Sequence, residues 1–405
     1  GVGFTSVYQI TDAPELLYEP EHWLLNEMAP PEERLRACDG ACGRDHEASG
    51  TTFVLPWARA ISPLRATLEV PPIHDAAIAD LEAALLEDAS RILPFLQHVT
   101  TVEVETRDQR CHVSRSPTDD GFVIADDEGE SRWLTLKTNF AGAAGAVIAG
   151  SAGLIKPERP TDITIALPLS GEAHPGVLYA TLPTQTASGL PGHVNASFFP
   201  KTDRKSVRFE NGYDSEWNRA VIAAVGQGLA ASSPQLADSI GIAAFWDFLG
   251  AISDFDRRAD PDQPNHASTY LEALRKVIPG LPVVETIEGS RATPRDVLLP
   301  AETELYGAVQ ALSQLGLAVV AEQLHRRLHT NNVYTAYEIR PLSARHIVER
   351  LASKDITEVF DPKSGPLNLD QVLQLLAALE RLPGKVANLD GVERVALVPC
   401  RNGLI

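Results

Sequence analysis

The sequence predicts an α+β protein, with mixed strands and helices in its first half and mainly helices in its second half. Three observations support this prediction. Runs rich in β-branched and aromatic residues recur between residues 51 and 200, which is typical of strands. Residues 75–98 place apolar side chains at helical spacing. Beyond Trp217, helical patterns prevail.

Composition limits the classes of protein to be considered. The chain has 405 residues, enough for two or three domains, and its 35 basic and 54 acidic residues give a net charge of −19. This acidic balance argues against a broad surface for nucleic acid or an anionic membrane, because both need clustered Lys and Arg. Four cysteines (Cys38, Cys42, Cys111 and Cys400) do not make a disulfide framework in a chain of this length. They suit a reducing compartment, and we expect the cytoplasm.

The elements of the first half follow from local patterns. Glycines open GVGFTSVYQITDAPEL and predict a loop, after which apolar residues form one side of a short helix. Residues 30–50 are polar and predict a loop or insertion, and TTFVLPW from residue 51 predicts a strand. The amphipathic helix of residues 75–98 should bend or end at Pro94. Further strands are predicted at TVEVET, FVIA, RWLTLKT, DITIALPL, VLYATLP and HVNASFFP.

An uncharged, Ala/Gly-rich stretch runs from Thr138 to Ile155. Polar residues interrupt it, so we expect a buried loop or weak helix rather than a membrane span. Beyond it, helices are predicted near 217–231, 234–252, 266–277, 302–328, 343–353 and 368–381, with irregular connections at 254–266 and 279–300. The domains expected are 1–110, 111–216 and 217–405.

The first residues suggest phosphate binding. Several backbone N–H groups beside a helix N-terminus hold phosphate well, and glycine allows the close approach that this needs. Gly1-Val2-Gly3-Phe4 before an apolar helix fits that requirement. Taken alone, two glycines before a helix also fit an ordinary tight turn.

GVGFTSVYQITDAPEL resembles the second glycine box of GHKL ATPases, written GxGFxSVxxxTD in their sacsin-like branch. The resemblance implies the C-terminal part of a Bergerat-type α/β sandwich, followed by an α+β middle domain and a mainly helical region. In that family the loop wraps the β- and γ-phosphates of ATP, so Gly1, Val2, Gly3 and Phe4 would offer backbone N–H groups to them. A Gly-Thr strand follows in the chaperone branch, which assigns Thr51 to the adenine side of the pocket.

A second block is longer and more specific. YATLPTQTASGLPGHVNASFFPKTDRKSVRF, followed by Trp217-Asn218, resembles the sacsin-like phrase FLPxxxxTGLPxHVNxxFxLxxxRR before a Trp. The resemblance implies that Arg204 reaches the γ-phosphate from the middle domain, with Lys201 and Lys205 as substitutes. The simpler alternative is that Arg204 caps or pairs at the surface. His193 and Asn195 have no nucleophile with an ordered base beside them, so we expect both to bond nearby backbone.

Other parts of a GHKL site precede the second glycine box in the family. They are an Asn that binds Mg²⁺, an acidic residue on the same helix that activates water, and a DxGxG segment for adenine. We therefore expect this chain to be a fragment truncated at its N-terminus, which alone neither hydrolyses ATP nor binds ATP and Mg²⁺ tightly. The resemblance assigns no metal ligand within it. An incomplete sheet would leave an open edge and an exposed apolar face, which favours self-association.

A zinc loop is a separate hypothesis. Cys38, Cys42 and His46, with Asp45, offer four ligands, although the spacing differs from that of common zinc knuckles. The ordinary alternative is two free cysteines in a loop.

The function predicted is that of a sacsin-like, chaperone-like, ATP-driven conformational module acting on a protein partner, with neither nucleic acid nor membrane as target. The alternative is a non-catalytic scaffold whose helical half binds partners. The acidic charge and the GLPxHVN phrase count against a third possibility, a MutL-type DNA-repair ATPase.

Overall fold

The computed structural model of the chain describes residues 6–18, 21–40, 50–169, 175–260, 264–353, 367–382, 399–400 and 403–404. Its contacts divide the chain into two compact units. The first comprises Gly1–Ala89 and Glu103–Cys111, and the second comprises Ser90–Val102 and His112–Ile405. The α+β class is confirmed. The Bergerat arrangement and the three-domain division stay predictions.

A four-stranded antiparallel sheet organises the first unit. Its strands are β1 (Glu15–Tyr18), β2 (Glu21–Leu25), β3 (Leu35–Ala37) and β4 (Thr51–Val54), in the order β3-β2-β1-β4. The short helix predicted after the glycines is a 3-10 turn, η1 (Ser6–Gln9). β1 and β2 were not predicted, and β3 lies inside the segment predicted to be a polar loop, residues 30–50. Such short strands carry too few residues for alternation to stand out, and pairing with neighbours defines them instead.

Apolar side chains remain exposed on this sheet. Register pairs Leu16 with Phe53, and Tyr18 lies on the same face because side chains two residues apart share a face. Tyr18 is 59% exposed, Phe53 52% and Leu35 54%. Self-association through this sheet stays a prediction.

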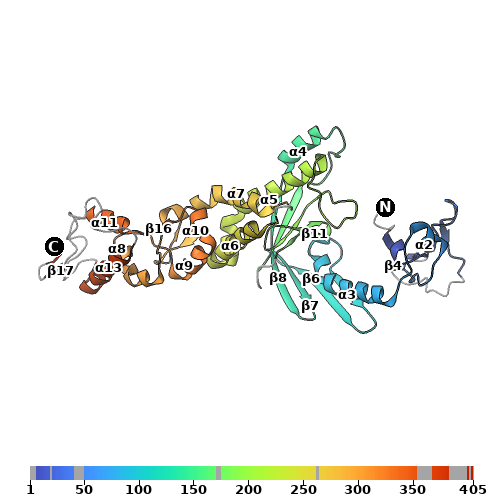
Figure 1. The fold of residues 1–405 in the computed structure, drawn as a ribbon, viewed down its shortest axis with the longest axis horizontal. Coiled ribbons are helices and arrows are strands. Elements are labelled where there is room, and N and C mark those ends of the chain that lie inside the picture. The colour runs from blue at the N-terminus through green and yellow to red at the C-terminus, as the bar shows by residue number, and fades with distance from the viewer. Residues whose placement is uncertain are drawn as a thin grey trace. The chain divides into compact units, whose positions relative to one another are not determined.

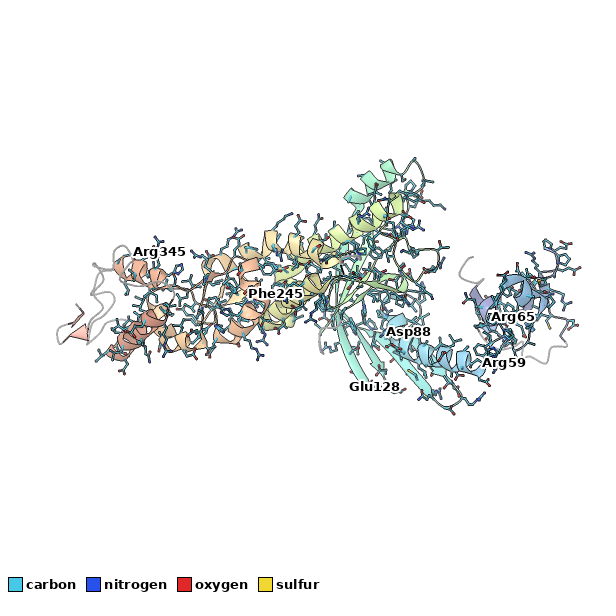
Figure 2. All side chains as sticks on the ribbon, in the orientation of Figure 1. Arg59, Arg65, Asp88, Glu128, Phe245 and Arg345 are labelled. Atoms are coloured by element: carbon cyan, nitrogen blue, oxygen red, sulfur yellow. The ribbon has the colours of Figure 1, made fainter. Side chains whose placement is uncertain are left out.

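The first unit also holds a buried arginine on α2 (Pro63–Leu68), labelled in Figure 2. Arg65 is 1% exposed. Its Nε lies 3.2 Å from Asp12 Oδ1, and its two terminal nitrogens donate to Pro71 O (2.5 Å) and Gln9 O (3.1 Å). The guanidinium thus ties the segment after η1 to α2 and to the residues that follow it.

The long amphipathic helix is confirmed. α3 spans Asp75–Ile92, and a 3-10 turn, η2 (Leu93–Phe95), contains Pro94 and ends it as predicted. Proline ends the helix because it lacks the N–H that the next turn would need.

An eight-stranded mixed sheet follows (Figure 1). The order is β11-β10-β12-β9-β8-β7-β6-β5, and the β10–β12 pair is parallel. The strands are β5 (Thr101–Glu105), β6 (Arg110–Pro117), β7 (Gly121–Asp126), β8 (Gly129–Asn139), β9 (Asp162–Pro168), β10 (Val177–Ala180), β11 (Leu182–Ala187) and β12 (His193–Asn195). Each predicted strand is present, although β12 stops at Asn195 and VLYATLP divides between β10 and β11. β6 was not predicted.

One long helix packs on the centre of this sheet. α5 (Tyr213–Ile240) packs on β8 and β9, and α7 (His266–Val277) lies along α5 (Figure 1). The predicted break between residues 231 and 234 is wrong, because α5 continues through Pro234. Leu229, Leu236 and Ala237, on both sides of the proline, are buried in one core, and their burial outweighs the lost backbone bond.

The remaining helices join this core or a second one. α6 (Ile242–Arg258) packs on α5, α7 and α9 (Glu322–His329), so the predicted linker from residue 254 actually begins as helix. The predicted helix 302–328 is wrong as one element. It divides into η5 (Thr303–Ala308), α8 (Val309–Gln314) and α9, since Gly316 at φ +74° ends α8 and Val320 then bridges to Thr286. α8, α11 (Ala344–Ala352) and α13 (Leu369–Arg381) surround the second core.

The weak Ala/Gly helix is confirmed as α4 (Ala141–Gly150), which packs on α5. A different glycine decides how closely α5 approaches the sheet. A Cβ on Gly228 would lie 2.8 Å from Thr138 Cβ on β8, closer than van der Waals contact permits.

Gly228→Ala is therefore expected to lower the free energy of unfolding of the second unit by about 1–3 kcal/mol, because overpacking displaces α5. Urea unfolding at pH 7.5 measures the change. Gly250→Ala in α6 is the matched control, since a Cβ there meets nothing within 4 Å. It should be neutral or stabilise the helix by about 0.5–1 kcal/mol. Equal losses in both variants would contradict the close approach of α5.

Candidate functional site

The predicted site residues fall in different parts of the chain. Gly1, Val2, Gly3 and Phe4 lie outside the described residues, so the phosphate loop stays a prediction. Thr51 begins β4, pairs with Tyr18 and is exposed. Thr51 belongs to the first unit and Arg204 to the second.

Arg204 lies in a hairpin of residues 199–208, called here the cationic hairpin. Pro200 and Val207 form its β-bridge, Lys201 N–H donates to Ser206 O (2.8 Å), and Arg208 N–H donates to Phe199 O (3.1 Å). Its side chains include four cations and one carboxylate: Lys201, Arg204, Lys205, Arg208 and Asp203. The hairpin is therefore a local basic element in an acidic protein.

The tip of the cationic hairpin is a tight turn. Arg204 has a φ of +59°, and its N–H donates to Lys201 O (2.9 Å). Asp203 Oδ1 accepts from the Lys205 N–H (2.9 Å), which closes the turn. Left-handed backbone is unfavourable for a residue with a Cβ, so the closed turn must hold Arg204 there.

The cations differ in their partners. Lys201 Nζ lies 2.6 Å from Glu210 Oε1, and Arg208 lies 2.7 Å from Asp214 Oδ2. The hydrogen bond from Lys201 lowers the pKa of Glu210. Within the described ranges, Arg204 and Lys205 form no ion pair, although both are exposed. The simple surface pairing considered for Arg204 is therefore not observed.

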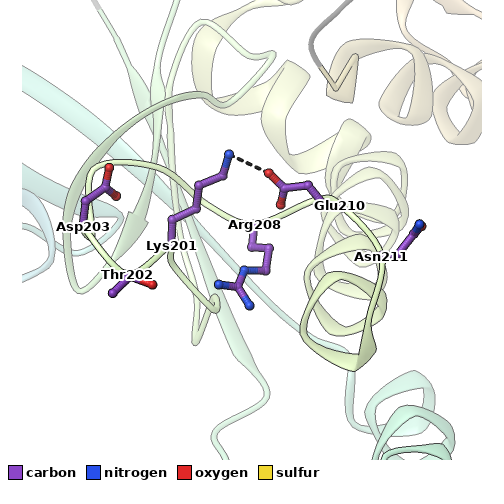
Figure 3. Close-up of a pocket in the computed structure, with 6 residues that line it drawn as sticks. All are labelled: Lys201, Thr202, Asp203, Arg208, Glu210 and Asn211. Atoms are coloured by element: carbon purple, nitrogen blue, oxygen red, sulfur yellow. Dashed lines mark ion pairs between the residues drawn. The ribbon is translucent and has the colours of Figure 1, made fainter.

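A cavity of about 500 Å³ lies beside the hairpin (Figure 3). Its lining comprises Lys201, Thr202, Asp203, Arg208, Glu210 and Asn211. The ion pairs of Lys201 and Arg208 leave the cavity close to electrical balance. At the tip, Arg204 and Lys205 stand beside the carboxylate of Asp203, so the three side chains carry a net charge of +1.

An arginine that the sequence analysis missed supports the segment leading into the hairpin. Arg159 Nη2 donates to Ser197 O (2.6 Å) and Phe198 O (3.0 Å), and its guanidinium lies 3.6 Å from the centroid of the Phe199 ring. Burial lowers the pKa of Arg159. Trp217 Nε1–H also donates to Ser197 O (2.9 Å). Arg159 stands in KPERP, where no local pattern distinguishes it from a surface arginine.

His193 and Asn195 have the backbone-bonding roles predicted for them. His193 Nδ1 accepts from Val177 N–H (3.1 Å), and Asn195 Oδ1 accepts from Thr181 N–H (3.0 Å). The His193 ring stacks on Trp133, with 5.1 Å between centroids. Both residues hold β12 beside β10.

The described part of the chain holds no group of three or more His, Cys, Asp or Glu side chains that could bind a metal ion. Cys38 is half-buried and free, while Cys42, Asp45 and His46 lie outside the residues described, so the zinc hypothesis stays untested.

No helix in the described ranges combines the length and the apolar character needed to cross a membrane. Comparison with known proteins found no matching protein-family model, no matching curated protein and no matching solved structure.

Proposed function

We propose that this chain is part of an ATP-dependent conformational protein similar to the sacsin-like GHKL ATPases, in which the cationic hairpin contacts the terminal phosphate of bound nucleotide. A protein partner is the proposed target of the resulting change in domain packing. The proposal rests on one observation above all. Arg204 and Lys205 project from a closely tied turn without ion pairs, in a chain whose net charge is −19.

Physical chemistry supports a phosphate as the partner of this tip. The guanidinium of Arg204 presents donors in a fixed fork that matches phosphate oxygens, and Lys205 adds a second positive charge. A cation at the γ-phosphate stabilises charge that develops during phosphoryl transfer and distinguishes ATP from ADP. Arg204 would in this way couple the state of the nucleotide to the second unit.

A scaffold function is the second candidate, and one observation favours it. A groove of about 410 Å³ lies between α5 and α7, lined mainly by small apolar side chains: Ala223, Ala230, Ala231, Ala273 and Val277, with Gln227, Thr269, Glu272 and Lys276. Such a groove suits an apolar segment of a partner. This function needs no nucleotide.

Arg204→Ala tests the proposed function. In the ATP-hydrolysing protein that this proposal describes, the variant is expected to lower the rate of ATP hydrolysis by about 10²–10³-fold, because it removes a cation from the transition state. On the present chain, it should weaken binding of inorganic tripolyphosphate, measured by amide chemical shifts of residues 201–208.

Arg219→Ala is the matched control. Arg219 is an exposed arginine of α5 whose Nη2 donates to Phe209 O and Glu210 O, outside the tip. It should retain hydrolysis and tripolyphosphate binding. Full hydrolysis in Arg204→Ala would contradict the proposed role and favour the scaffold.

A further inference from the structure

One buried amide side chain joins both strands of the cationic hairpin to the core. Asn218 lies in the first turns of α5 and is 0% exposed. Its Oδ1 accepts from Phe199 N–H (2.8 Å), and its Nδ2 donates to Phe199 O (2.9 Å) and to Arg208 O (2.7 Å). Phe199 and Arg208 are the two ends of the hairpin, so a single side chain fixes where it begins and ends.

The amide group suits this task for a chemical reason. Only Asn and Gln offer one acceptor and two donors on a rigid planar group, and Asn218 uses all three functions here. Toward Phe199 it forms the paired N–H and C=O bonds that a neighbouring strand would form. Because the side chain is short and buried, the position of α5 sets the position of the hairpin base.

The core holds α5 in turn. Trp217, the preceding residue, is 0% exposed, and its ring meets Phe140 edge-on with 4.9 Å between centroids. α5 also packs along β8 and β9. Asn218 therefore connects the hairpin to a helix that is itself immobilised by the sheet.

A second tether holds the other side of the hairpin. Thr186 Oγ1 on β11 accepts from Val207 N–H (2.8 Å), and Gln185 N–H donates to Lys205 O (2.6 Å). The hairpin is thus tied at its base by Asn218 and along one strand by β11. The side chains of Arg204 and Lys205 remain exposed at the tip of the cationic hairpin.

We propose that Asn218 is a positioning residue, which holds the cationic hairpin so that Arg204 and Lys205 point at a phosphate group of the ligand. The inference rests on the proposed function for the identity of that ligand. The orienting role itself rests on the three hydrogen bonds to Phe199 and Arg208. Pre-ordering the tip avoids the entropy that a free loop would lose on binding.

Asn218→Ser in the 405-residue chain tests the proposal. Hydrogen exchange followed by mass spectrometry should show amide exchange in residues 199–208 at least about tenfold faster, because the base of the hairpin loses hydrogen bonds to Asn218. The dissociation constant for inorganic tripolyphosphate should rise by about threefold to tenfold. Binding is measured at 20 °C, where the variant is verified to be folded, so a change in global stability does not alter it.

Two further variants separate positioning from general stability. Ser233→Ala removes another buried polar side chain of α5, whose hydroxyl donates to Leu229 O within the helix (2.9 Å). It should lower the melting temperature without changing hairpin exchange or tripolyphosphate affinity. Thr186→Val keeps the side-chain shape at a half-buried position, removes one of the two hydrogen bonds to β11 and should speed exchange of the Val207 amide severalfold.

The outcomes distinguish this inference from the proposed function. Faster hairpin exchange and weaker tripolyphosphate binding in Asn218→Ser, with neither in Ser233→Ala, support positioning. Unchanged hairpin exchange, or unchanged affinity despite faster exchange, overturns it. If wild type and Arg204→Ala bind tripolyphosphate equally, the phosphate assignment fails together with the ligand-directed role of Asn218. If Asn218→Ser binds tripolyphosphate as wild type does while Arg204→Ala binds it more weakly, the proposed function stands and the positioning role of Asn218 fails.

Discussion

Lowering the pH from 7.5 to 5 is expected to remove about 4 kcal/mol from the free energy of unfolding of the second unit. Two histidines, the buried His266 and the half-buried His193, cause most of the loss. Burial lowers the pKa of His193 to about 4, with a further contribution from the charge of Arg91, and burial alone lowers the pKa of His266 to about 4. His266 is 6% exposed, and among the described residues its Nε2 has no hydrogen-bond partner.

The sign follows from proton binding. In the unfolded chain both histidines take up a proton as the pH falls through about 6.5, whereas in the folded protein they remain neutral until about pH 4. Between these values the unfolded state binds more protons, so the free energy of unfolding decreases as the pH decreases. Each histidine accounts for about 2 kcal/mol at pH 5.

Urea unfolding between pH 7.5 and 5, followed by tryptophan fluorescence, measures this dependence. His266→Leu should remove about 2 kcal/mol of this loss, and it should not lower stability at pH 7.5, because it removes a buried nitrogen that lacks a partner. His98→Gln, at an exposed position, is the control and should follow wild type. The same pH dependence in His266→Leu and wild type would refute the assignment.

Arg65→Leu is expected to lower the free energy of unfolding of the first unit by about 2–4 kcal/mol, because it removes a buried guanidinium that pairs with the partly exposed Asp12 and donates two hydrogen bonds. The contact between Arg65 Nε and Asp12 Oδ1, at 3.2 Å, is an ion pair without hydrogen-bond alignment. The carbonyls of Pro71 and Gln9 would also lose their donor. A four-stranded sheet has little other stability with which to offset such a loss.

Hydrogen exchange followed by mass spectrometry resolves this effect by unit. Peptides from residues 6–89 should exchange rapidly in Arg65→Leu, while those of α5 remain protected. Arg59→Leu is the matched control, since Arg59 is 45% exposed and pairs with the exposed Asp75 at 2.6 Å. It should cost less than about 1 kcal/mol. Equal protection of the first unit in both variants would contradict a structural role for Arg65.

The candidate site was only partly predictable. The GLPxHVN block placed His193 and Asn195 near a strand and directed attention to Arg204. The block could not show that Asn218 joins the two ends of the cationic hairpin, because hydrogen bonds between residues 10 and 19 positions apart leave no periodic pattern. No local sequence pattern predicted that Arg159 and Arg65 would be shielded from solvent and bonded to backbone carbonyls either. The residue type does not show whether an arginine is buried or lies at the surface, and only the packing around it distinguishes the two roles.

The sequence by itself determined the elements whose causes are local. The helical spacing of residues 75–98, with a bend or end expected at Pro94, predicted α3, and the pattern of residues 266–277 predicted α7 with both of its ends. The tertiary structure alone decided that α5 continues through Pro234 and that residues 302–328 divide at Gly316. Propensity acts within a few neighbouring residues, whereas burial of apolar side chains sums over the whole core. Where the two conflict, the core contributes the larger free energy and determines the backbone.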